Sequence, residues 1–162
     1  MNIRSLFILF ILSFLFILNI SAQNIKEIDG LYYADSSLYT GTYLSYYENL
    51  QIKAEMKLVD GKKDGLSNLY FEDGSIKEIR SYKNNLMDGN WYTYNERGIK
   101  VSEAYYVDGK KNGTWKIWND DGKLIYELEY TMGEKTGTWR KYDLAGILID
   151  ERNYTATDND NR

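Results

Sequence analysis

The sequence predicts an all-β protein, a single elongated antiparallel sheet built from tandem β-hairpins behind an N-terminal signal helix. Three observations predict this fold. Glycines recur every 24 residues along most of the chain. Segments rich in tyrosine and tryptophan, which favour strands, alternate with short turn-forming segments. The chain also has no proline, the residue that a central strand tolerates least.

Residues 1–22 have the features of a cleaved secretory signal peptide. Arg4 supplies a positive start, an apolar run of 13 residues extends from Leu6 to Leu18, and two small residues end at Ala22, after which we expect the cut. A membrane-spanning helix needs about 20 apolar residues, so an uncleaved anchor is the weaker alternative and the only membrane attachment considered. The prediction is export, to the periplasm, the cell surface or the medium.

The composition of the mature chain excludes several classes of function. Removal of residues 1–22 leaves 162 − 22 = 140 residues with 19 Lys/Arg and 24 Asp/Glu, a net charge of 19 − 24 = −5. Nucleic acid is a poor partner for such a chain, because phosphates require a basic surface. The sequence has no histidine and no cysteine, which removes Ser-His-Asp triads, Cys-His pairs and ordinary zinc sites. We therefore predict no enzyme, no catalytic residue, no metal site and no cofactor.

The repeat is carried by three series of glycines that keep the same spacing and that we interpret as structural turn residues. The first series is Gly41, Gly65, Gly89, Gly113 and Gly137. The second series is Gly74, Gly98, Gly122 and Gly146, with Leu50 in its first position. The third series is Gly61, Gly109 and Gly133, with Asn85 in the gap. Asparagine is the best substitute for glycine at positive φ, so Asn85 supports the repeat.

Each unit is expected to form strand, tight turn, strand, tight turn. Asp-Gly and similar pairs next to alternating β-forming residues are strong hairpin signals. Five units occupy residues 41–154, and residues 23–40 resemble an incomplete unit that caps the array with a hairpin around Asp35. Residues 155–162 are polar and are expected to be a disordered tail.

Aromatic residues occupy fixed positions in the units and are the candidate partner-binding residues. Those two positions after the first glycine include Trp91, Trp115 and Trp139, and those five positions after it are Tyr46, Tyr70, Tyr94, Trp118 and Tyr142. A spacing of three places the two groups on opposite faces of a regular strand unless a bulge intervenes, and the sequence leaves both arrangements open. Equivalent residues lie two strands apart, about 9.6 Å, so interleaved side chains could form aromatic ladders. Such ladders either hold the sheet together or bind a partner.

A column of glutamates also follows the repeat and could suggest an acidic site. Its members are Glu55, Glu103, Glu127 and Glu151. Neighbours in this column would be about 9.6 Å apart, too far to share one calcium ion. We expect these glutamates to meet lysines and arginines of adjacent strands on a solvated face.

With this pattern in place, units such as Gly113-Thr-Trp-Lys-Ile-Trp-Asn-Asp-Asp-Gly122 resemble the MORN repeat variant. Residues 30–154 are similar to bacterial proteins of the YwqK-family antitoxin type, including the Tyr46-Tyr47-Glu48-Asn49 stretch, and depart from them at Leu50. The resemblance implies an extended antiparallel sheet without an active site and, for some relatives, an antitoxin or immunity role through a protein partner. The Gly-x-Gly pair of better-known MORN repeats is missing, so lipid binding is not carried over.

Two functions follow as hypotheses. The first is an exported protein-binding scaffold, an immunity-type partner of a secreted toxin being one form of it. The alternative is an envelope- or glycan-binding module that uses an aromatic face of the sheet, since tryptophan and tyrosine are prominent in both kinds of binding surface.

Overall fold

The computed structural model describes residues 24–155, which form strands and turns and contain no helix. The predicted signal peptide and most of the predicted tail lie outside the described residues. The strands are β1 (Ile25–Ile28), β2 (Leu31–Ala34), β3 (Ser37–Leu38), β4 (Gly41–Tyr46), β5 (Ile52–Val59), β6 (Lys62–Tyr70), β7 (Ile76–Lys83), β8 (Leu86–Tyr94), β9 (Lys100–Val107), β10 (Lys110–Lys111), β11 (Gly113–Trp118), β12 (Leu124–Thr131), β13 (Glu134–Tyr142) and β14 (Leu148–Tyr154).

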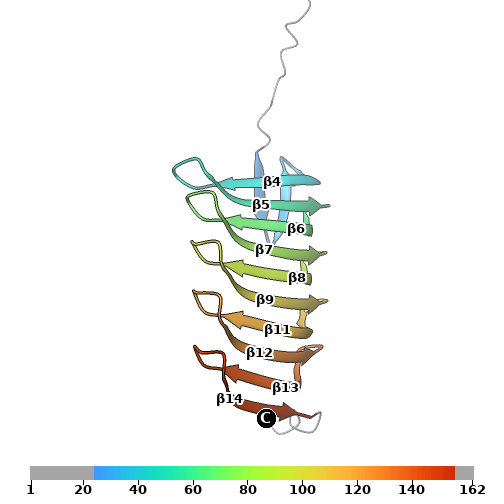
Figure 1. Ribbon diagram of the computed structural model, residues 1–162. Helices are drawn as coiled ribbons and strands as arrows, with labels where there is room; N and C mark the ends of the chain where they lie inside the picture. The colour runs from blue at the N-terminus through green and yellow to red at the C-terminus, as the bar shows by residue number, and fades with distance from the viewer. Residues whose placement is uncertain (1–23, 156–162) are drawn as a thin grey trace, which may run out of the picture.

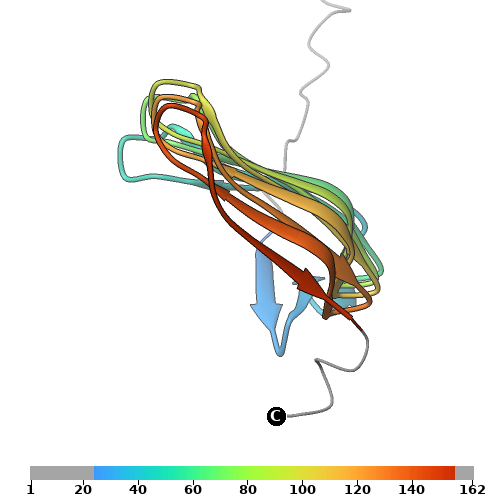
Figure 2. The same ribbon diagram turned by 60° about the horizontal axis from the view of Figure 1, so that its bottom comes forward.

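Strands β4 to β14 form one antiparallel sheet of 11 strands, and apart from the short β10 they follow one another across the sheet in sequence order (Figure 1). Strand β10 pairs only with β9 and is separated from β11 at Asn112, so the two together act as the first strand of the fourth unit. The five hairpins lie on top of one another when the sheet is turned (Figure 2). The predicted all-β meander of five hairpin repeats is confirmed.

Two kinds of turn connect the strands, one at each margin of the sheet. Two-residue turns such as Asp60-Gly61 have positive φ at both residues, 47° and 73°, which is the type I′ geometry that matches the twist of paired strands. Asn85 has φ 68° in the equivalent turn, as expected for a glycine substitute. The longer turns at the other margin end on a residue with positive φ, and Leu50 adopts φ 66° there without changing the turn.

The interpretation of the first glycine series as turn residues is wrong. Gly65 lies inside β6 at a bulge where Asp64, Gly65 and Leu66 face the single residue Lys57. Gly89 lies inside β8 at the equivalent bulge, opposite Ser81. Gly89 has φ 98°, and a Cβ there would lie 3.0 Å from Ser81 Oγ. These glycines therefore permit a bend and a close backbone approach within a strand, which the spacing alone does not distinguish from a turn.

The predicted N-terminal hairpin around Asp35 is confirmed as β2 and β3, but it does not extend the edge of the large sheet. Strands β1, β2 and β3 form a separate antiparallel sheet that lies across one face of the large sheet near β4 to β6 (Figures 1 and 2). Among residues 24–155, no strand pairs with the outer edge of β4. The small sheet docks through the Tyr32 amide on the Gly61 carbonyl at 2.9 Å and the Gly61 amide on the Tyr39 carbonyl at 2.8 Å.

The core of the docked region explains this position. Tyr32 is 3% exposed, and Leu58 and Ser67 in the large sheet are each 1% exposed. Ser67 stands where later units have tryptophan, and Leu58 where they have tyrosine. The Tyr32 ring lies 5.1 Å from that of Tyr43. We infer that β2 supplies the aromatic ring that the second unit lacks.

Candidate functional site

One face of the large sheet carries a row of alternating rings, and we call it the ladder face. Tryptophans of the first strands alternate with tyrosines of the second strands, and successive ring centroids are 4.8 to 5.2 Å apart from Trp91 to Tyr154. Interplanar angles of 52° to 61° give the tilted contacts that aromatic quadrupoles favour. The members are Trp91, Tyr106, Trp115, Tyr130, Trp139 and Tyr154. The predicted ladder of Trp91, Trp115 and Trp139 is confirmed, with a tyrosine bridging each gap.

Cations cover the rings of this row. Lys111 Nζ lies 4.4 Å from the Trp115 centroid and 4.9 Å from that of Tyr130. Lys135 repeats this contact one unit later, 4.5 Å from Trp139. In the third unit Met87 replaces the lysine, and the guanidinium of Arg80 lies 4.7 Å from Trp91 instead. The cation–π contacts and the ring contacts together engage the ladder tryptophans in holding the sheet.

Burial in the row changes the acidity of its tyrosines. Burial raises the pKa of Tyr106 and of Tyr130 above the ordinary tyrosine value, because a phenolate would be poorly solvated between rings. A second cause for Tyr106 is the neighbouring Tyr130. The row thus favours neutral phenols.

The remaining candidate residues lie on the other side of the sheet, which we call the opposite face. In β8 the run from Trp91 to Tyr94 is regular, because the extra residue of the local bulge, Val101, is in the partner strand β9. Both faces therefore carry aromatic residues. The bulge does not bring the two aromatic positions of the unit, Trp91 and Tyr94, onto the same face. The opposite face carries Tyr46, Tyr70, Tyr94, Trp118 and Tyr142. Within residues 24–155 the ring-to-ring contacts join other residues, and Tyr46 is 54% exposed.

The predicted column of glutamates lies on the opposite face, and Glu103, Glu127 and Glu151 are paired with basic residues. Glu127 lies 3.4 Å from Lys116 and 3.6 Å from Arg140, and Arg140 also binds Glu151 at 3.0 Å. Lys100 Nζ contacts Glu103 at 2.5 Å and lies 4.9 Å from the ring of Trp118. The Tyr70 hydroxyl donates to Glu55 at 3.2 Å. The expected pairing with basic residues of adjacent strands is confirmed for Glu127 and Glu151, whereas Glu103 pairs with Lys100 of its own strand.

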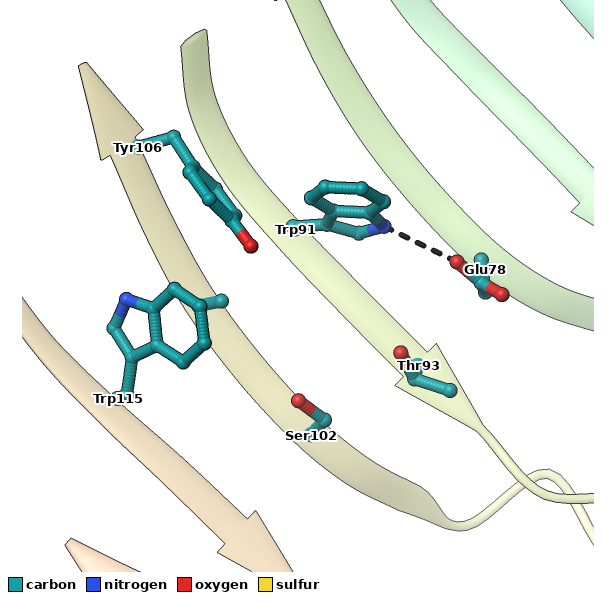
Figure 3. Close-up of a pocket in the computed structure, with 7 residues that line it drawn as sticks. Glu78, Trp91, Thr93, Ser102, Tyr106 and Trp115 are labelled. Carbon is teal, nitrogen blue, oxygen red and sulfur yellow. Dashed lines mark hydrogen bonds between the residues drawn. The ribbon is translucent and has the colours of Figure 1, made fainter. Parts of the chain in front are cut away.

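A hollow of about 170 Å³ lies beside the ring row on the ladder face, in the third unit. Figure 3 shows the rings of Trp91, Tyr106 and Trp115 around it, and the Trp91 indole N–H donates to Glu78 Oε2 at 3.2 Å. The equivalent indole of Trp115 donates to the Tyr105 carbonyl at 3.1 Å, so Trp91 is turned differently. The hollow is lined by Glu78, Trp91, Thr93, Ser102, Ala104, Tyr106 and Trp115.

The hollow exists because two side chains of β9 are small. Ser102 and Ala104 occupy the positions where β12, one unit later, has Tyr126 and Leu128. Glu78, one unit earlier, is held by Arg80 at 2.7 Å, and its side chain is 17% exposed. Of the lining residues, the sequence predicted only Trp91 and Trp115. Aligning the second strands of the units would have shown the small residues, but not the turned indole.

Comparison with known families agrees with the repeat. The family model of the MORN repeat variant matches residues 63–84 and 111–131, which correspond to the β6–β7 hairpin and to the hairpin of β10, β11 and β12. No curated protein matches the chain. Within residues 24–155 there is no helix long and apolar enough to cross a membrane. Two of the five hairpin units are thus matched by the MORN repeat variant.

Proposed function

We propose that this protein is an exported, non-enzymatic scaffold that binds a partner protein through the opposite face. The observation that carries the proposal is the different use of the two aromatic groups. The ladder tryptophans are engaged with rings and cations, whereas Tyr94, Trp118 and Tyr142 lie half-exposed on the opposite face and outside that stack. Half-exposed rings that make no ring-to-ring contact within residues 24–155 are available for a partner.

The chemistry of the opposite face supports a protein as the partner. Tyrosine and tryptophan are enriched among the residues that dominate protein interfaces. Here they alternate with charges that are already paired, such as Lys116 with Glu127 at 3.4 Å. Paired charges at half-exposed positions provide orientation and specificity more than affinity. The extended sheet presents these groups in register along several units.

We further propose that the partner is a secreted toxin, which makes this an immunity-type protein. Two sequence features support this narrower proposal: the resemblance of residues 30–154 to YwqK-family antitoxins, and the secretory features of residues 1–22. An inhibitor of an exported toxin has to meet it outside the cytoplasm, and an exported scaffold satisfies that condition.

The test is affinity capture with residues 23–162 as bait, from periplasmic and surface extracts of the source cells. We expect one protein in stoichiometric amount, and we expect Tyr94→Ala combined with Trp118→Ala to weaken its binding by about 2 kcal/mol or more. The matched control is Leu86→Ala, which removes a 49% exposed apolar side chain at the margin of the two-residue turns. Capture that is equal for the control and the double variant would contradict the proposal.

A further inference from the structure

We propose that the hollow on the ladder face binds one uncharged sugar ring, a pyranose unit of a glycan. This inference goes beyond the proposed protein-binding function, because it concerns the other face of the sheet. It is carried by three properties of the hollow: its size, its unused polar atoms and its charge balance.

The size of the hollow admits a single ring. A volume of 170 Å³ is slightly larger than the roughly 150 Å³ of a cavity that holds benzene. It is well below the roughly 300 Å³ at which pockets begin to enclose drug-sized molecules. The rings of Trp91, Tyr106 and Trp115 form its apolar surfaces (Figure 3), and the C–H faces of a pyranose stack on such rings.

Three polar atoms at the hollow are available for hydrogen bonds. Arg80 and the Trp91 indole donate to Oε2 of Glu78. Oε1 of Glu78 and the hydroxyls of Thr93 and Ser102 have no hydrogen-bond partner among residues 24–155. A purely apolar guest would desolvate these atoms without replacing their hydrogen bonds. A sugar presents hydroxyls to them and apolar C–H groups to the rings.

The charges around the hollow favour a neutral guest. Arg80 lies 4.7 Å from the Trp91 ring and Lys111 lies 4.4 Å from the Trp115 ring, so a further cation would be repelled from rings already engaged by cations. The carboxylate of Glu78, the charged residue among those that line the hollow, is already paired with Arg80 at 2.7 Å, so the lining offers no unpaired charge to an ionic guest. A lysine or arginine of a partner protein is therefore disfavoured, as is a carboxylate or phosphate.

The test uses residues 23–162 and four soluble trisaccharides: cellotriose, chitotriose, maltotriose and mannotriose. Isothermal titration calorimetry and tryptophan fluorescence are recorded up to about 10 mM sugar, which covers dissociation constants as weak as about 1 mM, or −4.1 kcal/mol. We expect saturable binding of at least one trisaccharide. A flat response to all four would overturn the proposal.

The variants come from the repeat itself. Ala104→Leu and Ser102→Tyr each fill the hollow with the side chain that β12 has at the equivalent position, Leu128 or Tyr126, so the sheet already accommodates both. We expect each to weaken sugar binding at least tenfold, an increment of 1.4 kcal/mol. Glu78→Gln, with almost unchanged shape, should weaken it less.

The control is Trp118→Ala on the opposite face, which should leave sugar affinity unchanged. Sugar binding that survives both filling variants would place the sugar elsewhere and contradict the proposal. If no sugar binds, and Ala104→Leu instead abolishes capture of the partner protein, the hollow is a pocket for a protein side chain and the sugar proposal is wrong. If only the opposite-face variants lose capture of the partner protein, the proposed function is supported. The sugar proposal is then judged from the sugar titrations alone.

Discussion

The two faces of the sheet carry similar numbers of aromatic side chains and use them differently. On the ladder face Trp115 touches Tyr106 and Tyr130, each at 5.2 Å, and Lys111 covers it. On the opposite face Trp118, three residues further on, meets Lys100 and lies outside the ring stack. An open single-layer sheet has little core, so contacts between neighbouring side chains on its surface must stabilise it. The comparison teaches that one face can provide that stability and leave the other for recognition.

The largest expected effect is the difference in lost stability between a tryptophan substitution on the ladder face and one on the opposite face. Trp115→Ala removes a ring from the middle of the row and should lower the free energy of unfolding by about 3 kcal/mol. Trp118→Ala should lower it by about 1 kcal/mol, because that side chain lies outside the ring stack and makes a cation–π contact with Lys100. Urea unfolding of both variants measures the difference, and equal losses would contradict the division between faces.

The second prediction concerns the N-terminal end of the ladder face. Tyr32→Ala should cost about 3 kcal/mol, because the ring is 3% exposed. Adding Ser67→Trp to Tyr32→Ala restores the repeat's own side chain, and we expect it to recover stability, with a coupling of about 1 to 3 kcal/mol in a double-mutant cycle. Ser67→Trp alone should destabilise, because both rings then compete for one space.

Additive effects in this cycle would show that Tyr32 does not substitute for the missing tryptophan. The conservative variant Tyr32→Phe is the control, since it keeps the ring and removes the hydroxyl.

The strands, both turn margins and the ladder could be predicted from the sequence, because glycine spacing and aromatic positions are local properties of each unit. The role of Gly65 could not be, since a bulge and a turn place glycine at the same interval. The docking of β2 was also missed: it depends on space left by Ser67, 35 residues later in the chain (67 − 32 = 35). The hollow depends on side chains that are small, Ser102 and Ala104, and such absences give a weak signal.

The third prediction concerns how the stability of the ladder face depends on pH. The pKa values of Tyr106 and Tyr130 are raised by burial, so the folded state retains their protons where the unfolded chain loses them. Stability is therefore constant below the ordinary tyrosine pKa of about 10 and falls as the pH rises through the raised values. Tyr32, whose pKa burial and Glu27 also raise, adds to this loss.

Urea midpoints measured at about pH 9 and about pH 11, on either side of that value, check the prediction. Tyr106→Phe and Tyr130→Phe should each reduce the alkaline loss. Tyr94→Phe on the opposite face is the matched control. An alkaline loss that the ladder variants leave unchanged would contradict the assignment.

The smallest expected effect is on the ion pairs of the opposite face. Glu127 and Arg140 have side chains that are 23% and 34% exposed, and pairs of this kind contribute about 0.2 to 1 kcal/mol. Glu127→Gln should therefore change stability by about 0.5 kcal/mol, and less in high salt. A loss comparable to that of Trp115→Ala would mean that charges, and not rings, hold the sheet.

The most direct measurement of the central claim is side-chain labelling by hydroxyl radicals, with and without the captured partner. The account predicts that Tyr94, Trp118 and Tyr142 are labelled in the free protein and protected in the complex, while labelling of Trp139 and Tyr154 on the ladder face is unchanged. Protection of Trp139 and Tyr154, with Trp118 still labelled, would contradict it.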